Sequence, residues 1–120
     1  MAITEIEPRD AQAADAECID GLDTDKLRAA AQKAVRALRV MANEDRLLLL
    51  CQLSQGELCV QDLEASLDIR QPTLSQQLGV LRNEGVVSTR RDGRRIYYSV
   101  SDPELLQVLG ALYMTYCPKE

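Results

Sequence analysis

The 120-residue chain contains no histidine, tryptophan or phenylalanine. The lack of imidazole excludes Ser-His-Asp and Cys-His catalysis and every metal site that needs a histidine ligand. Because the four aromatic residues are all tyrosines, we expect an aliphatic core, which favours packed helices over a β-sandwich. The longest apolar run, Leu47–Cys51, is too short to span a bilayer, and the acidic N-terminus has no basic-then-apolar leader. We therefore expect a single cytoplasmic domain.

The charges are distributed unevenly along the chain. The net charge of −5 argues against a nucleic-acid partner, but it hides two opposite regions. Residues 1–25 carry eight acids and one base, whereas residues 70–95 carry six arginines and two acids. This pattern predicts an acidic, mobile tail over residues 1–23 and a functional domain over residues 24–118 that contains a basic module.

Apolar residues recur at helical spacing in several segments. A first helix is predicted from Asp23 or Thr24 to about residue 41, and a second begins at the cap Asn43 and ends at Gly56. A short third helix covers residues 60–67, and a fourth begins at Pro72. The last helix starts at Ser101 or Asp102 and stops at Pro118. Its apolar face and that of the first helix exceed what so small a core can use, which predicts a homodimer formed through these two helices.

The fourth helix has an unusual outer face. Leu74, Leu78 and Leu81 share one side, leaving small hydroxyl and amide side chains on the other. A solvated surface normally carries lysine and glutamate, whereas reading base edges in DNA requires hydroxyls and amides. The predicted contacts to operator double-stranded DNA on this segment are Gln71, Thr73, Ser75, Gln76, Gln77 and Arg82. A helix-capping role for Gln71 is the alternative.

A β-hairpin follows. Two strand-like runs, Val86–Arg91 and Arg94–Val100, flank Asp92-Gly93, which is a strong turn signal. Four arginines crowd the tip, which favours phosphate or minor-groove contact over a merely solvated turn. These DNA-contact candidates are Arg90, Arg91, Arg94 and Arg95. Together, the short helices and the hairpin predict a winged helix-turn-helix, mainly α with a β-hairpin wing.

At this point the sequence resembles the ArsR/SmtB family of bacterial repressors over about residues 26–118. The resemblance rests on Ala42–Leu47, Gly56–Leu63, Gln71–Leu78 and the arginine-rich hairpin. It implies a dimeric DNA-binding repressor and not an enzyme. The family often has histidine where Gln77 stands, and the absence of histidine removes the site of the zinc-sensing branch.

Leu47–Cys51 and Leu112–Pro118 resemble the sulfide- and persulfide-responsive BigR/SqrR/YgaV-like subgroup of this family. The resemblance implies that Cys51 and Cys117 form a redox-sensor pair. A disulfide or polysulfide bridge between them would release operator DNA and derepress sulfide-detoxification genes. Periodicity alone favours a packed small hydrophobe for Cys51, which follows four leucines, whereas Cys117 stands near a polar end where packing gains little.

Other functions remain as alternatives. A thiolate-based metal or arsenite sensor could use Cys59 and Cys18, but Gln61 stands where the arsenic branch has its second thiol, and two ligands make a poor soft-metal site. We expect no other metal and no cofactor. A small redox enzyme is disfavoured because the chain has no Cys-x-x-Cys motif and no cofactor loop. A DNA-binding module without sensing would bind DNA regardless of any thiol reagent.

Overall fold

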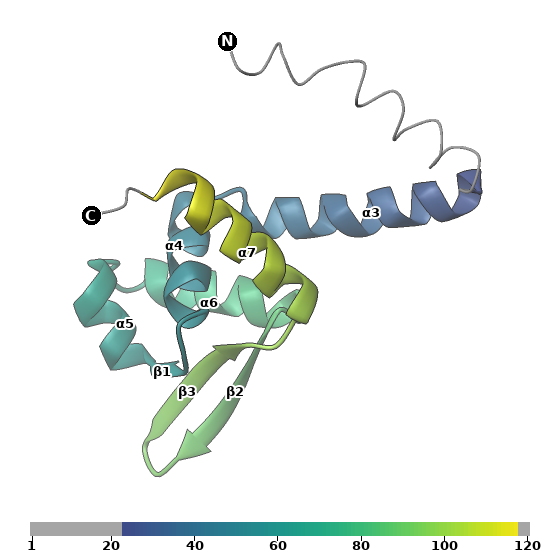
Figure 1. The fold of residues 1–120 in the computed structure, drawn as a ribbon. Helices are drawn as coiled ribbons and strands as arrows, with labels where there is room; N and C mark the ends of the chain where they lie inside the picture. The colour runs from purple at the N-terminus through teal and green to yellow at the C-terminus, as the bar shows by residue number, and fades with distance from the viewer. Residues whose placement is uncertain (1–22, 118–120) are drawn as a thin grey trace. The chain divides into compact units, whose positions relative to one another are not determined.

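The computed structural model describes residues 23–117 (Figure 1). The expected acidic tail, Cys18 and Pro118 fall outside these residues, apart from Asp23. The chain divides at residues 36 and 37 into two units, and the second contains every element after α3. The elements are α3 (Thr24–Met41), α4 (Glu44–Leu53), β1 (Leu58–Cys59), α5 (Val60–Leu67), α6 (Thr73–Asn83), β2 (Val87–Asp92), β3 (Arg95–Val100) and α7 (Pro103–Tyr116).

Side-chain caps begin three of the helices. Asp23 Oδ1 accepts a hydrogen bond from the backbone N–H of Asp25 at 3.0 Å, which places Asp23 at the start of α3. Asn43 Oδ1 accepts from the backbone N–H of Arg46 at 3.0 Å and starts α4. Asp102 caps α7, with proline in the first turn. These caps satisfy N–H groups that would otherwise lack partners, and they confirm the predicted helix starts.

Leucine forms most of the core of residues 37–117. Helix α4 lies at its centre and contacts α5, α6, α7 and β3. The predicted inner face of α6 is confirmed, since Leu74, Leu78 and Leu81 are all buried. Tyr98 is the one tyrosine in this core. The largest fully buried side chains are those of Leu49, Leu50, Leu63, Leu74, Leu78, Leu81, Leu105 and Leu109.

The hairpin belongs to a three-stranded antiparallel sheet of order β1-β3-β2. Figure 1 shows β2 and β3 extending together away from the helices of this unit. The short strand β1 was not predicted, because two residues are too few to show an alternating pattern. The turn also lies one residue later than expected, since Asp92 pairs with Arg95 and leaves Gly93-Arg94 between the strands. Gly93 has φ 67°, a conformation that favours glycine.

Among residues 23–117, no helix is both long and apolar enough to cross a membrane. The architecture is mainly helical with a small antiparallel hairpin, as the sequence predicts.

Candidate DNA-binding surface and thiol pocket

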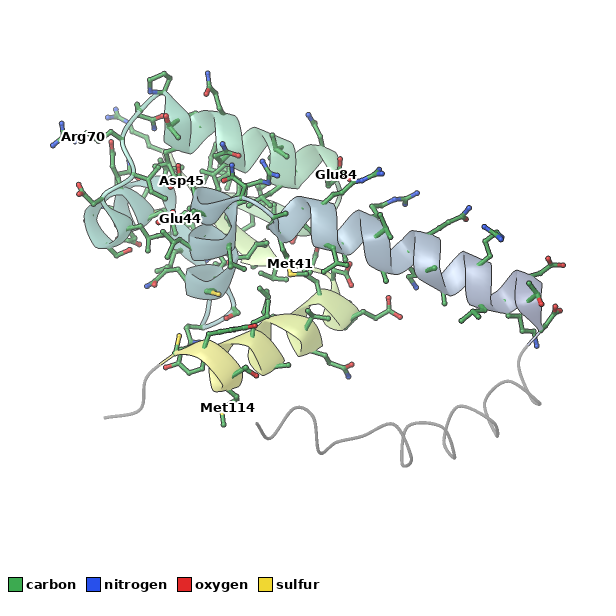
Figure 2. All side chains as sticks on the ribbon, turned by 90° about the horizontal axis from the view of Figure 1, so that it is seen from above. Met41, Glu44, Asp45, Arg70, Glu84 and Met114 are labelled. Carbon is green, nitrogen blue, oxygen red and sulfur yellow. The ribbon has the colours of Figure 1, made fainter. Side chains whose placement is uncertain are left out.

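Helix α6 presents polar side chains opposite its buried leucines. Ser75, Gln76 and Arg82 are exposed, and Thr73 is half-buried. Arg70, in the loop before the helix, extends away from the neighbouring side chains (Figure 2). The predicted contacts Ser75, Gln76 and Arg82 are therefore accessible to a partner, and their contact with DNA stays a prediction.

Gln71 is a helix cap in this structure. Its Oε1 accepts hydrogen bonds from the backbone N–H of Ser75 at 3.1 Å and from Ser75 Oγ at 2.7 Å. These bonds satisfy one of the first N–H groups of α6 and direct the Ser75 hydroxyl hydrogen toward Gln71. The capping alternative for Gln71 therefore has direct geometric support, and its amide nitrogen is the part left to contact DNA.

Gln77 is held by Arg46, a residue that the sequence did not single out. Arg46 Nη1 donates to Gln77 Oε1 at 3.0 Å. The same guanidinium donates through Nε to the carbonyl of Val40 at 2.7 Å and through Nη2 to the carbonyl of Arg39 at 3.1 Å. One side chain of α4 thus links the end of α3 to α6. The sequence offered one indication of the position of Arg46, because a residue three places after the cap Asn43 must lie in the first turn of α4.

The four wing arginines, Arg90, Arg91, Arg94 and Arg95, are all exposed, but only some of them have a partner within the protein. Arg90 donates from Nε and Nη2 to the two carboxylate oxygens of Glu57, at 2.7 and 2.9 Å, and its guanidinium carbon lies 4.7 Å from the centre of the Tyr97 ring. The hydrogen bond from Arg90 holds the pKa of Glu57 below its ordinary value. Arg91 and Arg94 are exposed, with no ion-pair partner in the part of the chain described. Two arginines are therefore fully available to a phosphate backbone.

Arg95 is also exposed, but it has a protein partner. A hydrogen bond with Tyr97, followed by the charges of Cys59 and Tyr97, raises the pKa of Arg95. The side chain stays cationic at any pH at which DNA binds. Its charge therefore adds to that of Arg91 and Arg94 on the wing.

Cys51 and Cys117 line one pocket between α4 and α7. The cavity has a volume of about 520 Å³. Half of the lining residues are leucine or tyrosine, and Glu44 is the one charged side chain among them. Cys51 is half-buried and Cys117 is exposed, and both are free thiols. The sequence-predicted sensor pair is therefore brought to a single site.

The surroundings of Cys51 make its thiol less acidic. Burial in the apolar wall raises the pKa of Cys51, and the charge of the Cys117 thiolate raises it further. A thiolate, and not a thiol, is the nucleophile in sulfur exchange. Exposed Cys117 is therefore the better placed to react first.

Cys59 has a different environment from the pocket thiols. It is fully buried at the start of α5, and its Sγ donates to Asp62 Oδ2 at 3.2 Å. No group of three or more cysteine, aspartate or glutamate side chains suited to a metal ion occurs within residues 23–117. Cys18, the other thiol of the metal-sensing alternative, lies outside the described residues.

Comparisons with known proteins identify the relatives of the chain. The family model "Bacterial regulatory protein, arsR family" matches residues 43–89. The Biofilm growth-associated repressor of Agrobacterium fabrum is 51% identical over 83 residues, which are 69% of this chain and 71% of the relative. The repressor of the same description from Xylella fastidiosa (strain Temecula1) is 42% identical over 90 residues, covering 75% of this chain and 79% of the relative.

Solved structures show the same fold. The transcriptional repressor BigR from Xylella fastidiosa superposes with a TM-score of 0.75 and 38% identity, over 82% of this chain and 100% of that one. Reduced HlyU from Vibrio cholerae superposes with a TM-score of 0.74 and 38% identity, over 78% and 98% of the two chains. These relatives are transcriptional regulators and not enzymes. The chain therefore belongs to the ArsR family of bacterial regulatory proteins, as a transcriptional repressor with a winged-helix fold.

Proposed function

We propose that this protein is a cytoplasmic homodimeric repressor that binds operator DNA when reduced and releases it when reactive sulfur species bridge Cys51 and Cys117. The observation that carries the proposal is that both thiols line one pocket, although they are 66 positions apart in the sequence. By the resemblance to the persulfide-responsive subgroup, the regulated genes would serve sulfide detoxification.

The chemistry needs only an organic persulfide, RS–SH, as the oxidant. The Cys117 thiolate attacks its terminal sulfur and forms a Cys117 persulfide, with RS⁻ as the leaving group. The Cys51 thiolate then attacks the Cys117 sulfur, giving a disulfide and releasing HS⁻. If the Cys117 persulfide first takes a second sulfur from another RS–SH, which releases RS⁻, the Cys51 thiolate attacks the sulfur next to the terminal one and gives a trisulfide and HS⁻. In each case the persulfide sulfur is reduced and the two thiols are oxidised.

A bridge between these residues joins α4 to the C-terminal end of α7. A disulfide requires the two Cα atoms to lie within about 7 Å, whereas a longer polysulfide spans more distance with less strain. Either link limits how α7 can move against the helix that contacts α6. A preference of about 1–3 kcal/mol for the non-binding arrangement would lower operator affinity about 5- to 150-fold.

The homodimer part of the proposal is supported by apolar side chains on the outside of α3 and α7. Many large apolar side chains left exposed on a small protein are typical of an interface, and a two-fold dimer places two reading helices about 34 Å apart on DNA. The exposed large apolar side chains on these two helices are Leu27, Val35, Leu38, Leu106, Val108, Tyr113, Met114 and Tyr116. Analytical ultracentrifugation of the reduced protein tests the dimer, and a monomer at micromolar concentration would contradict it.

The sensing proposal is tested by peptide mass mapping and DNA binding on the same samples. The reduced protein is treated anaerobically with an organic persulfide, and its affinity is measured for a duplex that it selects from a random pool. We expect a linked Cys51–Cys117 peptide and a loss of affinity that dithiothreitol reverses. Cys51→Ser and Cys117→Ser should bind DNA normally when reduced and should not respond.

Cys59→Ser is the matched control, because it also removes one thiol but lies outside the pocket. It should respond as the wild type does. If persulfide leaves operator affinity unchanged, the sensing proposal is wrong. If instead arsenite or Cd²⁺ releases DNA and Cys59→Ser abolishes that release, the protein is a thiolate-based metal sensor.

A further inference from the structure

The amide of Gln77 is oriented by a partner that can only donate hydrogen bonds. A guanidinium has five N–H donors and no acceptor. The Gln77 atom that lies 3.0 Å from Arg46 Nη1 must therefore be the oxygen Oε1. Oxygen and nitrogen of a glutamine amide are often interchangeable, but here the partner fixes which is which. The other end of the amide, Nε2, is consequently a donor only.

This donor has no protein partner. No acceptor for Nε2 of Gln77 occurs among residues 23–117. Gln77 is half-buried and sits on the edge of α6 between the buried leucine side and the outer face, one turn after Thr73. A partly buried N–H without an acceptor is costly, and such groups normally find a partner in a ligand or in water.

Arg46 is itself held firmly. Two of its donors bind the carbonyls of Val40 and Arg39, in the last turn of α3, where carbonyl groups lack helical partners and the helix dipole is negative. The guanidinium therefore cannot follow Gln77 if that side chain changes rotamer. Gln77 has one orientation that keeps its bond with Arg46.

We propose that Arg46 is a positioning residue that sets Gln77 as a dedicated hydrogen-bond donor to DNA. Gln77 then contacts an acceptor of the duplex, and it rejects a donor such as the amino group of cytosine or adenine at that position. The acceptor is either a phosphate oxygen or a base-edge oxygen or nitrogen, such as those of guanine. The inference rests on operator binding by α6 and is independent of the sulfur chemistry proposed above.

Two substitutions of Gln77 separate donation to DNA from a purely structural role. Gln77→Met keeps the length of the side chain but cannot donate, and we expect it to lower operator affinity about tenfold, the value of one good hydrogen bond. Gln77→Glu keeps and strengthens the bond to Arg46, so its melting temperature should equal or exceed that of the wild type. Its operator affinity should nevertheless fall at least as far as that of Gln77→Met, and the fall should persist at high salt.

Modified duplexes identify the acceptor. Single 7-deazaguanine substitutions remove the guanine N7 acceptor, and single methylphosphonates remove a phosphate charge and oxygen. One modified position should weaken the wild type and leave Gln77→Met unaffected, and the type of modification says whether the acceptor is a base or a phosphate. Wild-type affinity in Gln77→Met, or equal sensitivity of both proteins at every modified position, would overturn the proposal.

A double-mutant cycle tests the positioning role of Arg46. Lysine keeps the charge but cannot reach three acceptors with a planar fork. Arg46→Lys should weaken operator binding in the wild-type background and have much less effect in the Gln77→Met background. Equal effects in both backgrounds would show that Arg46 only joins α4 to the end of α3 and does not position Gln77. Because each comparison uses reduced protein, its outcome is separable from the outcome of the persulfide experiments.

Discussion

The thiol pocket is lined mainly by apolar side chains and the candidate DNA-binding surface by polar and charged ones, although α4 contributes to both. The pocket between α4 and α7 is apolar, with Glu44 as the one charged residue among those that line it. The candidate DNA-binding surface on α6 and the wing consists of amides, hydroxyls and arginines, several of which are held by hydrogen bonds. Helix α4 carries Cys51 to the first and Arg46 to the second.

Because both sites include residues of α4, a reaction in the thiol pocket can alter the contacts of the other surface. Cys51 and Arg46 lie on one ten-residue helix, and Leu49, Leu50 and Leu53 of that helix are buried in the core. A close-packed interior transmits displacement instead of absorbing it. A bridge that shifts α4 would therefore also move the guanidinium that contacts α6.

The largest effect is expected from the core that both surfaces share. Leu109 of α7 is 1% exposed, whereas Met114 of the same helix is 62% exposed and points away from the core (Figure 2). Leu109→Ala should lower the free energy of unfolding by about 2–5 kcal/mol, because it leaves a cavity. Met114→Ala is the matched control and should change that free energy by less than about 0.5 kcal/mol. Urea unfolding of the reduced proteins measures both, and similar values would show that α7 does not dock as described.

The next effect concerns the wing alone. Arg91→Ala combined with Arg94→Ala should lower operator affinity about 10- to 100-fold and reduce the dependence of log affinity on log salt by about 1.8, since each phosphate contact contributes about 0.9. Both side chains are exposed, so the melting temperature should stay constant. A persulfide should still link the pocket cysteines of this variant. An unchanged salt dependence would show that the wing does not contact phosphates.

A smaller effect should distinguish Arg90 from its neighbours. The carboxylate of Glu57 already neutralises the charge of Arg90 and accepts hydrogen bonds from two of its nitrogen atoms, Nε and Nη2. Arg90→Ala should therefore reduce the salt dependence by less than Arg91→Ala does. Glu57→Gln should have the opposite sign, raising affinity a few-fold, because it frees a cation near the duplex. If Arg90→Ala reduces the dependence of log affinity on log salt as much as Arg91→Ala does, the ion pair between Arg90 and Glu57 opens when DNA binds.

Sequence patterns predicted the elements of this fold well, because each depends on local chemistry. The caps Asn43 and Asp102, the leucine stripe of α6 and the glycine of the hairpin act within a few residues, and the structure has them where expected. Strand β1 was missed because its only support is pairing with β3, some 40 positions later in the chain.

The sites were predictable in type but not in detail. The pattern of arginines indicated a basic wing, but it could not show that Glu57 engages one of them from a loop 33 positions away. The polar face of α6 was correctly recognised, but the roles of Gln71 and Gln77 depend on partners found only in three dimensions. The pairing of Cys51 with Cys117 was predicted only from the family resemblance, since no local sequence pattern connects α4 to the end of α7.

The smallest effect lies within the pocket and tests whether the two thiols influence each other electrostatically. Burial is the larger cause of the raised pKa of Cys51, and the charge of Cys117 is the smaller. Cys117→Ser removes only the second cause, so the pKa of Cys51 should fall while remaining above that of an ordinary thiol. A pH titration of protein labelled with ¹³C at the cysteine Cβ atoms measures this directly, and Cys59→Ser, which lies outside the pocket, should leave the Cys51 titration unchanged. If Cys117→Ser also leaves it unchanged, the two sulfurs are too far apart to interact, and only a bridge longer than a disulfide could join them.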